Sequence, residues 1–162
     1  MPVKKIGNWG AARRMVFGTK RDILSANEIA LRQIGLKGER MVVKYIQSQP
    51  STWPELGDKY RKWKSKHGFS NLMLMRTKDM FNRITSFSTK EEVFIGLRRE
   101  ALNREGESLA NIAAVHEFGS KKRGIPARPF LMPTHQALMA QDIQKLFTEI
   151  YLRECKRKYG HK

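Results

Sequence analysis

Apolar residues recur at helical spacing in a long segment of the N-terminal half. Ser25 followed by Glu28 forms a capping-box pattern, which predicts that a helix starts there and runs to about Gln49. The apolar stripe of this helix consists of Ala30, Ile34, Met41 and Tyr45, with Ile29, Val42 and Ile46 beside it. Gly35 and Gly38 interrupt the pattern, and each weakens a helix by about 1 kcal/mol relative to alanine.

A second long apolar stripe lies near the C-terminal end. Pro133 or Thr134 is expected to start a helix that continues to about Tyr159, because proline is tolerated in a first helical turn. The stripe that this helix would bury consists of Met139, Ile143, Leu146, Phe147, Ile150 and Tyr151.

Shorter elements are expected between the two long helices. Two prolines in "PSTWPELG", residues 50–57, predict a loop, and "DKYRKWKSKHG" predicts a short helix closed by Gly68. The segment 72–84 predicts an entry strand and a short helix capped by Thr77. In "ITSFSTKEEVFIGLR", two apolar runs flank a polar turn, which is typical of a hairpin.

A third helix is expected after a polar connector over residues 99–108. Ser108 can cap "LANIAAVHEF", and Gly119 can end it. The whole pattern predicts an α+β fold in which a small antiparallel sheet with a hairpin is flanked by two long amphipathic helices. We expect a basic N-terminal arm at 1–24, a single domain at 25–152, and a basic tail at 153–162.

The charge balance is the strongest compositional feature. With 32 lysines and arginines against 15 acidic residues, the formal net charge is +17. That excess is larger than solubility requires, so it favours an anionic partner such as nucleic acid or an acidic protein surface. No apolar run approaches the roughly 20 residues that span a bilayer, so we expect no membrane partner.

His116 and Glu117 are the candidates for acid–base chemistry. Adjacent helical residues point about 100° apart, however, and a zinc-protease pattern would need a second histidine where Ser120 stands. The single cysteine and the scattered histidines form no metal-ligand spacing. We therefore expect no enzyme, no cofactor and no metal, and a structural role for His116.

The proline-rich segment "IPARPFLMP" carries more information. Residues before proline avoid helical geometry, so Ile125, Arg128 and Met132 should be extended. One interpretation is a preformed docking strand, in which Arg128 offers a planar fork to a carboxylate or phosphate. Phe130 and Leu131 would be available to anchor this segment into a core or into a neighbour. The alternative is an ordinary buried connection between two helices.

Basic residues gather in clusters outside the predicted core. For Trp63 we favour an inward-turned ring over one that stacks on bases. The candidate contacts with DNA or an acidic partner are Lys62, Lys64, Lys66, Lys121, Lys122, Arg123, Arg153, Lys156, Arg157 and Lys158.

"AAVHEFGS", a basic turn and then "GIPARPFLMPT" before an amphipathic helix resemble the C-terminal half of tail-completion (neck) proteins of tailed bacteriophages. That group includes Mu-type virion morphogenesis proteins and minor tail proteins. Upstream, "LMRTKDMFNRI" resembles a segment in which Lys78 stands where glycine is usual and Met80 where leucine is usual. The residues that carry the resemblance, and that it implies for the docking segment, are His116, Glu117, Phe118, Gly119, Pro126, Arg128, Pro129 and Phe130.

The resemblance implies a structural protein of the virion. It would be made in the host bacterial cytoplasm, complete the tail, and join tail to head as a homo-oligomeric ring around the DNA channel. The implied partners are connector or head-completion proteins and tail-terminator or tail-tube proteins, with nonspecific DNA contact in the lumen. The alternative is a free nucleic-acid-binding protein without sequence specificity.

Overall fold

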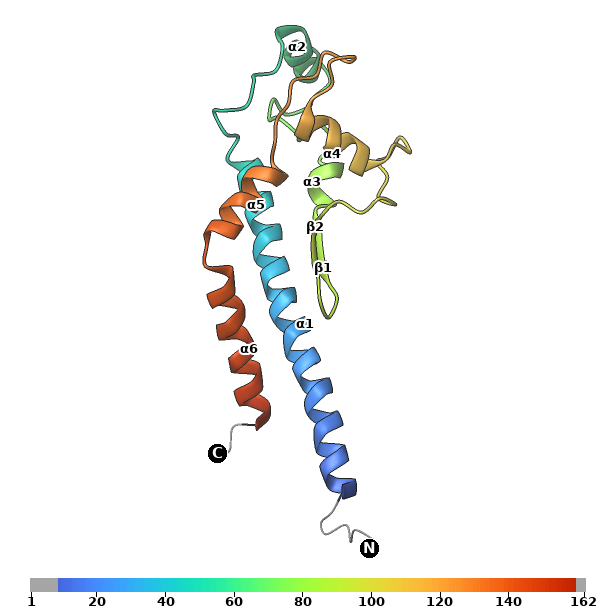
Figure 1. Ribbon diagram of the computed structural model, residues 1–162. Coiled ribbons are helices and arrows are strands. Elements are labelled where there is room, and N and C mark those ends of the chain that lie inside the picture. Colours follow the sequence, from blue (N-terminus) through green and yellow to red (C-terminus); the bar gives the residue numbers. More distant parts are fainter. Residues whose placement is uncertain (1–8, 160–162) are drawn as a thin grey trace, which may run out of the picture.

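A single long helix is the axis of the molecule in the computed structural model, which describes residues 9–159 and the side chains of 18–157. This helix, α1, spans Trp9–Gln47 (Figure 1). The other elements, in chain order, are α2 (Asp58–Lys66), α3 (Asp79–Asn82), β1 (Thr85–Ser88), β2 (Val93–Gly96), α4 (Leu109–Phe118), α5 (Leu131–Ala140) and α6 (Ile143–Tyr159).

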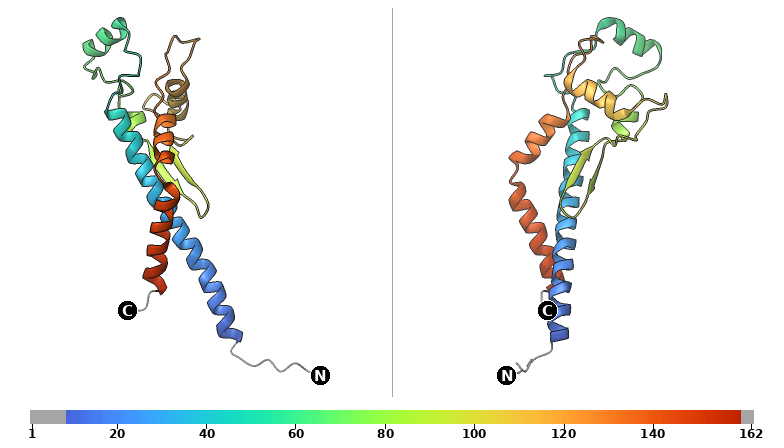
Figure 2. Two further views of the ribbon diagram at one scale, coloured as in Figure 1. Left: turned by 60° about the vertical axis from the view of Figure 1, so that its left-hand side comes forward. Right: turned by 45° about the vertical axis from the view of Figure 1, so that its right-hand side comes forward.

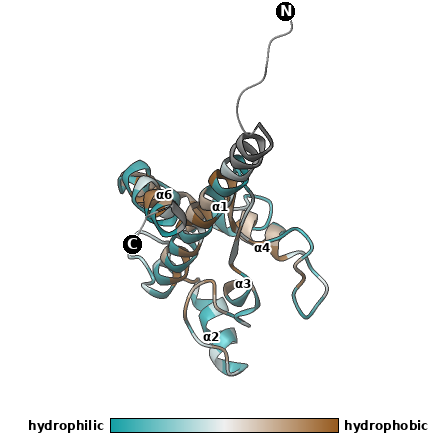
Figure 3. Ribbon diagram, turned by 90° about the horizontal axis from the view of Figure 1, so that it is seen from below, coloured by the Kyte–Doolittle hydropathy of each residue, from teal (hydrophilic) through white to brown (hydrophobic). Residues whose placement is uncertain are grey.

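The elements form an elongated molecule with a head at one end. α2, α3 and α4 gather around the C-terminal end of α1, while α5 and α6 run back along α1 in the opposite direction (Figures 1 and 2). In an end-on view α6 and α4 lie on opposite sides of α1, and α2 is mostly hydrophilic (Figure 3). The predicted α+β fold with a two-stranded antiparallel sheet is confirmed.

α1 begins much earlier than expected. The helix starts at Trp9, so Ser25 lies within it and does not cap it. The expected arm therefore overlaps this helix from residue 9 onward, and residues 1–8 lie outside the described part. Charge and scattered glycines suggested an unfolded segment, but 9–24 also contains the good helix formers alanine, arginine, methionine and leucine. These N-terminal turns extend beyond the tip of the hairpin (Figure 2).

The hairpin forms where the sequence predicted it. β1 and β2 pair in antiparallel register, with Ser86 opposite Ile95 and Phe87 opposite Phe94. Because side chains alternate across a strand, Ser86 and Ile95 share the face toward α1. Phe87 and Phe94 stack on the outer face with ring centroids 4.9 Å apart. The Asn27 side chain on α1 donates a hydrogen bond to the carbonyl of Lys90 in the turn, which fixes the hairpin along the helix.

Two glycines of α1 let the hairpin approach closely. A Cβ atom on Gly35 would lie 2.7 Å from Cγ2 of Val93 and 3.2 Å from Cβ of Ser86. A Cβ on Gly38 would lie 2.3 Å from Cδ1 of Ile95 and 3.1 Å from Cδ2 of Leu138 on α5. The glycines lower intrinsic helix stability, as the sequence indicated, but they occupy positions where a side chain does not fit.

The hydrophobic core lies at the head end of α1. The last turns of the helix meet α3, α4, the base of the hairpin and three residues from connecting segments. The buried residues of this cluster are Val42, Ile46, Trp53, Met75, Met80, Ile84, Leu97, Leu109, Ala113 and Phe130.

Two boundaries in the middle of the chain differ from the prediction. Residues 71–76 form turns instead of an entry strand. Lys78, not Thr77, precedes α3, and its φ of 61° is left-handed, a conformation that non-glycine residues seldom adopt. No side chain caps this short helix. The amphipathic pattern there carried too few residues to separate a strand from a series of turns.

The C-terminal helix also differs from the prediction. It starts at Leu131, so Met132 is helical, and it breaks at Gln141 and Asp142 into α5 and α6. Met139 is 58 % exposed as a result, whereas Ile150 on α6 is buried. Met132 precedes Pro133, and the bias of such residues toward extended geometry is overcome here by bonds described below.

We predict that Gly35→Ala destabilises the protein by about 1–3 kcal/mol, because the new methyl group overpacks against Val93 and the strand carbon of Ser86. Helix propensity alone would give a gain of about 1 kcal/mol. Urea denaturation measures the difference.

Gly18→Ala is the matched control in the same helix. Nothing lies within 4 Å of a Cβ at Gly18, so this change should stabilise the protein by about 0.5–1 kcal/mol. Equal effects of the two substitutions would mean that the hairpin does not press on α1 at Gly35.

Candidate functional site

The segment that carries the resemblance folds into a junction between the end of α4 and the start of α5. Glu117, which is 7 % exposed, points its carboxylate at the first turn of α5. Its Oε2 accepts hydrogen bonds from the backbone N–H groups of Phe130 and Leu131 at 2.8 and 2.9 Å. Its Oε1 accepts one from the N–H of Met132 at 2.8 Å.

The carboxylate of Glu117 gives hydrogen-bond acceptors to the backbone N–H groups at the start of α5. The first turn of a helix has N–H groups without a partner inside the helix, and a negative charge there also interacts favourably with the helix dipole. The next residue, Pro133, has no N–H. The bonds to Glu117 therefore stabilise helical geometry through Met132 and supply the physical reason for the early start of α5.

Gly119 ends α4 and allows the chain to turn back. Its φ is 76°, and a Cβ atom there would lie 2.9 Å from the backbone nitrogen of Ala127. Ser120 and Ile125 then close the basic turn 121–124 with paired backbone bonds of 2.7 and 3.0 Å. At the other end of α4, Oγ of Ser108 accepts the N–H of Asn111 at 3.4 Å, so the predicted cap is present.

Arg128 is buried and uses two of its guanidinium nitrogens inside the chain, so it does not present the expected planar fork at the surface. The residue is 5 % exposed. Nε donates to the carbonyl of Pro54 at 2.8 Å, and Nη2 donates to the carbonyl of Glu55 at 2.9 Å. The guanidinium thus ties the proline segment to the 50–57 loop, as in the alternative of a buried connection.

Phe130 is also internal. It is fully buried in the core, so it cannot be the external anchor that the docking interpretation assigned to it. Next to it, the carbonyl of Pro129 accepts a hydrogen bond from Nε1 of Trp53 at 2.9 Å. Trp53 packs edge-on against Tyr45 of α1, with ring centroids 5.9 Å apart. The proline segment is therefore joined through Trp53 to the end of α1.

His116 and Glu117 do not act on a shared site in this fold. Both carboxylate oxygens of Glu117 are engaged by the backbone of α5, and the carbonyl of His116 accepts the N–H of Arg128 at 2.6 Å. Nδ1 of His116 is buried without a hydrogen-bond partner. Burial, and to a smaller extent the charge of Arg128, lowers the pKa of His116 below its ordinary value.

Of the residues that carry the resemblance, Phe118 and Pro126 are exposed to solvent. Phe118 is 76 % exposed at the last position of α4. Met132, bonded through its N–H to the adjacent Glu117, is 52 % exposed. Sequence reasoning placed Phe118 in the docking segment without separating exposed from buried members, because the pattern of a helix end does not tell which side its last residue faces.

The three candidate lysines of the basic helix α2 differ in their exposure to solvent. Lys62 and Lys66 are exposed, whereas Lys64 is 2 % exposed, which rules it out as a surface contact. Nζ of Lys64 donates to the carbonyl of Leu72 at 2.8 Å. Trp63, expected to turn inward, is 39 % exposed and stacks on Tyr60 with ring centroids 5.7 Å apart.

The other basic clusters lie at opposite ends of the molecule. Lys121, Lys122 and Arg123 are exposed on the head near α2, and Arg153, Lys156 and Arg157 are exposed on α6. Arg157 pairs with Glu154 at 2.9 Å, and Arg153 donates to Gln33 of α1 at 3.1 Å. The side chain of Lys158 lies outside the described part.

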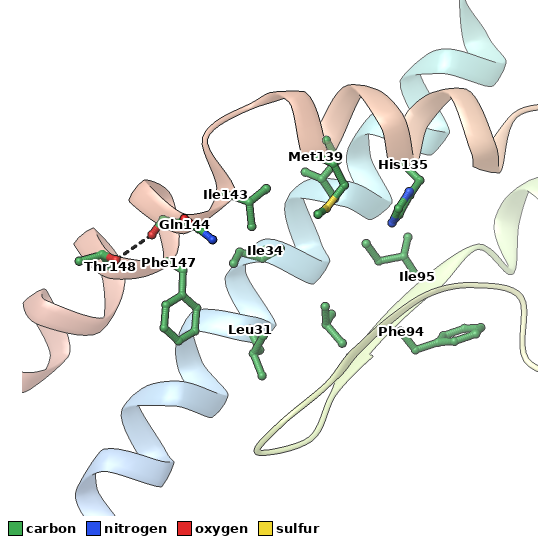
Figure 4. A pocket seen from close by; sticks show the side chains of 12 residues that line it. Leu31, Ile34, Phe94, Ile95, His135, Met139, Ile143, Gln144, Phe147 and Thr148 are labelled. Atoms are coloured by element: carbon green, nitrogen blue, oxygen red, sulfur yellow. Dashed lines mark hydrogen bonds between the residues drawn. The ribbon is translucent and has the colours of Figure 1, made fainter.

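An apolar groove of about 730 Å³ runs between the hairpin and the C-terminal helices. Leu31 and Ile34 of α1 form its floor, Ile95 lies on one side, and Phe147 extends from α6 toward α1 (Figure 4). Met139 of α5 also lines it (Figure 4). Ile34 is buried at this floor, whereas Met139 is 58 % exposed.

Within 9–159 no group of three or more histidine, cysteine, aspartate or glutamate residues is placed to hold a metal ion. Among the helices of that part, none combines the length and the apolar character needed to cross a membrane.

Comparison with known proteins gives one informative match. The chain is 30 % identical over 114 residues to "Uncharacterized protein MJ0331" of Methanocaldococcus jannaschii, covering 67 % of this chain and 74 % of that protein. The chain belongs to the family of this archaeal protein. No family model matches the chain. No solved structure matches it either.

We predict that Glu117→Ala destabilises the protein by about 2–4 kcal/mol, because it removes three charge-assisted bonds and leaves the N–H of Phe130 buried without a partner. Thermal and urea unfolding would measure the loss.

Glu149→Ala, at an exposed position on α6, is the control and should change stability by less than about 0.5 kcal/mol. Glu117→Gln keeps one acceptor oxygen and should fall between the two. A Glu117→Ala protein as stable as the control would mean that the junction does not depend on the carboxylate.

Proposed function

We propose that the chain is a non-enzymatic structural protein of a phage virion, which completes the tail and joins it to the head as part of a homo-oligomeric ring. Its partners would be connector or head-completion proteins on one side and tail-terminator or tail-tube proteins on the other. In this role the protein acts in the virion neck after synthesis in the bacterial cytoplasm.

The observation that carries the proposal is the contrast within the resembling segment. Glu117, Arg128 and Phe130 are buried and make their contacts inside the chain. Phe118, between Glu117 and the turn at Gly119, leaves 76 % of its surface in solvent. A large aromatic side chain that is exposed in the isolated chain offers apolar area that a neighbouring subunit can bury, which suits a contact at an interface.

Lys78 gives additional support for the resemblance. It stands where the resembling proteins usually have glycine, and its φ of 61° is the conformation that glycine adopts most readily. The turn before α3 therefore has the geometry that the usual residue would favour.

The shape and the charge of the molecule suit assembly into a ring whose channel holds DNA. The molecule is elongated, with exposed cations on the head and others on α6 at the opposite end (Figure 1). A ring of such subunits would present positive charge to passing DNA or to acidic surfaces of the adjoining rings.

A second candidate function is nucleic-acid binding without sequence specificity. The outward position of Trp63 favours it, since Trp63 and Tyr60 form an exposed aromatic stack on the same helix as the exposed Lys62 and Lys66. Basic side chains interleaved with exposed aromatic rings are typical of single-stranded nucleic-acid sites. This candidate predicts strong, salt-dependent binding by the isolated monomer.

We predict that Phe118→Ser leaves the free energy of unfolding within about 0.5 kcal/mol of wild type, because the ring is exposed, yet prevents particle assembly. In the virus that encodes the protein, filled heads and finished tails should accumulate without joining. Electron microscopy of lysates and a count of infectious particles would measure this.

Leu102→Ser, at a residue that is 54 % exposed on the 99–108 connector, is the matched control and should assemble normally. Fully infectious particles that carry Phe118→Ser would contradict the docking role. Tight DNA binding by the monomer, lost on Trp63→Ala with assembly intact, would favour the second candidate.

A further inference from the structure

A cleft of about 580 Å³ opens in the head, between α2, the 74–80 segment, α4 and the turn at 123–128. Its volume is in the range of pockets that hold small molecules. Part of the lining is apolar, including Leu74, Met80 and Ile112, and the ring of Tyr60 lies along it.

The charged side chains around this cleft are unbalanced. Five lysines and arginines line it together with His116, against two carboxylates; the cations are Lys64, Arg76, Lys78, Arg123 and Arg128. Both carboxylates have partners of their own. Asp79 pairs with Arg104 at 3.2 Å, and Glu107 accepts from Asn103 at 3.0 Å. Among the cations, Arg76 pairs with Glu105 at 3.1 Å, whereas the other four have no carboxylate partner within the described residues. Excess positive charge therefore faces the cleft.

Lys64 is the clearest sign of a ligand. It is 2 % exposed and bonds to one carbonyl, that of Leu72, although an ammonium group can donate three hydrogen bonds. Burial, and then the charge of Arg76, lowers the pKa of Lys64. A buried lysine without a carboxylate is unfavourable unless an anion offsets its charge.

Arg128 and His116 also have unused hydrogen-bonding capacity there. Arg128 uses Nε and Nη2 for carbonyl groups, which leaves Nη1 without a partner among the described residues. Nδ1 of His116 is buried and likewise unpartnered. Both residues line the cleft, so donors from α2, α4 and the proline segment surround one space.

We propose that this cleft binds a small phosphate-bearing anion, held by Lys64, Arg76 and Arg128. Donors that come from three different elements suit an oxyanion with several oxygens better than a single flat carboxylate. The apolar lining and the ring of Tyr60 leave room for an organic part of the ligand. This site is separate from the surface around Phe118 and does not depend on the role in assembly.

Pyrophosphate is the probe, titrated into the full chain by calorimetry at two salt concentrations. Wild type should show saturable 1:1 binding. Lys64→Met should weaken it at least tenfold. Lys62→Met and Lys66→Met remove the same charge from exposed positions of the same helix and should stay within twofold of wild type. Succinate in place of pyrophosphate should bind at least tenfold more weakly.

Because Lys64 is buried, its substitution could unfold the head, so two further measurements keep the test decisive. Arg76→Gln, at a partly exposed residue, should also weaken binding at least tenfold while circular dichroism stays unchanged. In the wild type, saturating pyrophosphate should raise the pKa of His116 measured by NMR, since a nearby anion favours the imidazolium. The ring signals of the exposed His135 should not respond to pyrophosphate.

Absence of saturable binding by the wild type would overturn the proposal. Equal losses in Lys62→Met and Arg76→Gln would overturn it too, because they would show attraction to the overall charge and not to the cleft. Binding of DNA alone, with no response of His116, would have the same consequence and would instead support the second candidate function.

Discussion

The carboxylate of Glu117, bound to three successive backbone N–H groups, is the interaction on which the head of the molecule depends. It fixes where α5 starts, and the position of α5 determines where Phe130 enters the core. The neighbouring proline segment is then tied to the 50–57 loop by Arg128 and Trp53. The end of α4, the proline segment with the start of α5, and the distant 50–57 loop are thus held together by a few charged or aromatic side chains that hydrogen-bond to backbone atoms.

Along α1, the close fit of the hairpin and α5 against the helix is equally important for the fold. Gly35 and Gly38 remove side chains from one face of α1, so that the hairpin and α5 pack directly on the helix backbone. The helix loses some intrinsic stability at these positions, and the contacts with Val93, Ile95 and Leu138 offset that loss. The same close approach places the hairpin beside α5 and α6 and creates the apolar groove between them.

Local patterns were enough to predict much of the fold. The hairpin, the end of α1, the short helix α2 and the Ser108–Gly119 helix each depend on residues close in sequence, such as a polar turn, a cap or a closing glycine. The early start of α1 was missed because charge and glycine content outweighed helix propensity. The break at Gln141 was missed because neither glycine nor proline marks it.

The candidate site was predictable in its location but not in the direction of its side chains. The sequence selected Glu117 and Arg128, yet it could not show that their side chains bond to backbone atoms of residues up to 74 positions away. Nor could it show that Phe130 lies in the core. The burial of Lys64 and the exposure of Trp63 could not be predicted either. Lysines lie on every side of α2, so its sequence does not indicate which side faces the rest of the protein. Long-range hydrogen bonds leave no periodic trace in a sequence.

The role of Glu117 in holding the start of α5 can be tested directly by amide hydrogen exchange at the first turn of α5. We expect the amides of Phe130 and Leu131 to exchange only when the whole domain unfolds. The first amides of α2, where no side chain caps the helix, should exchange much faster and provide an internal reference. Exchange at Phe130 and Leu131 as fast as at the start of α2 would show that the carboxylate does not hold the junction closed.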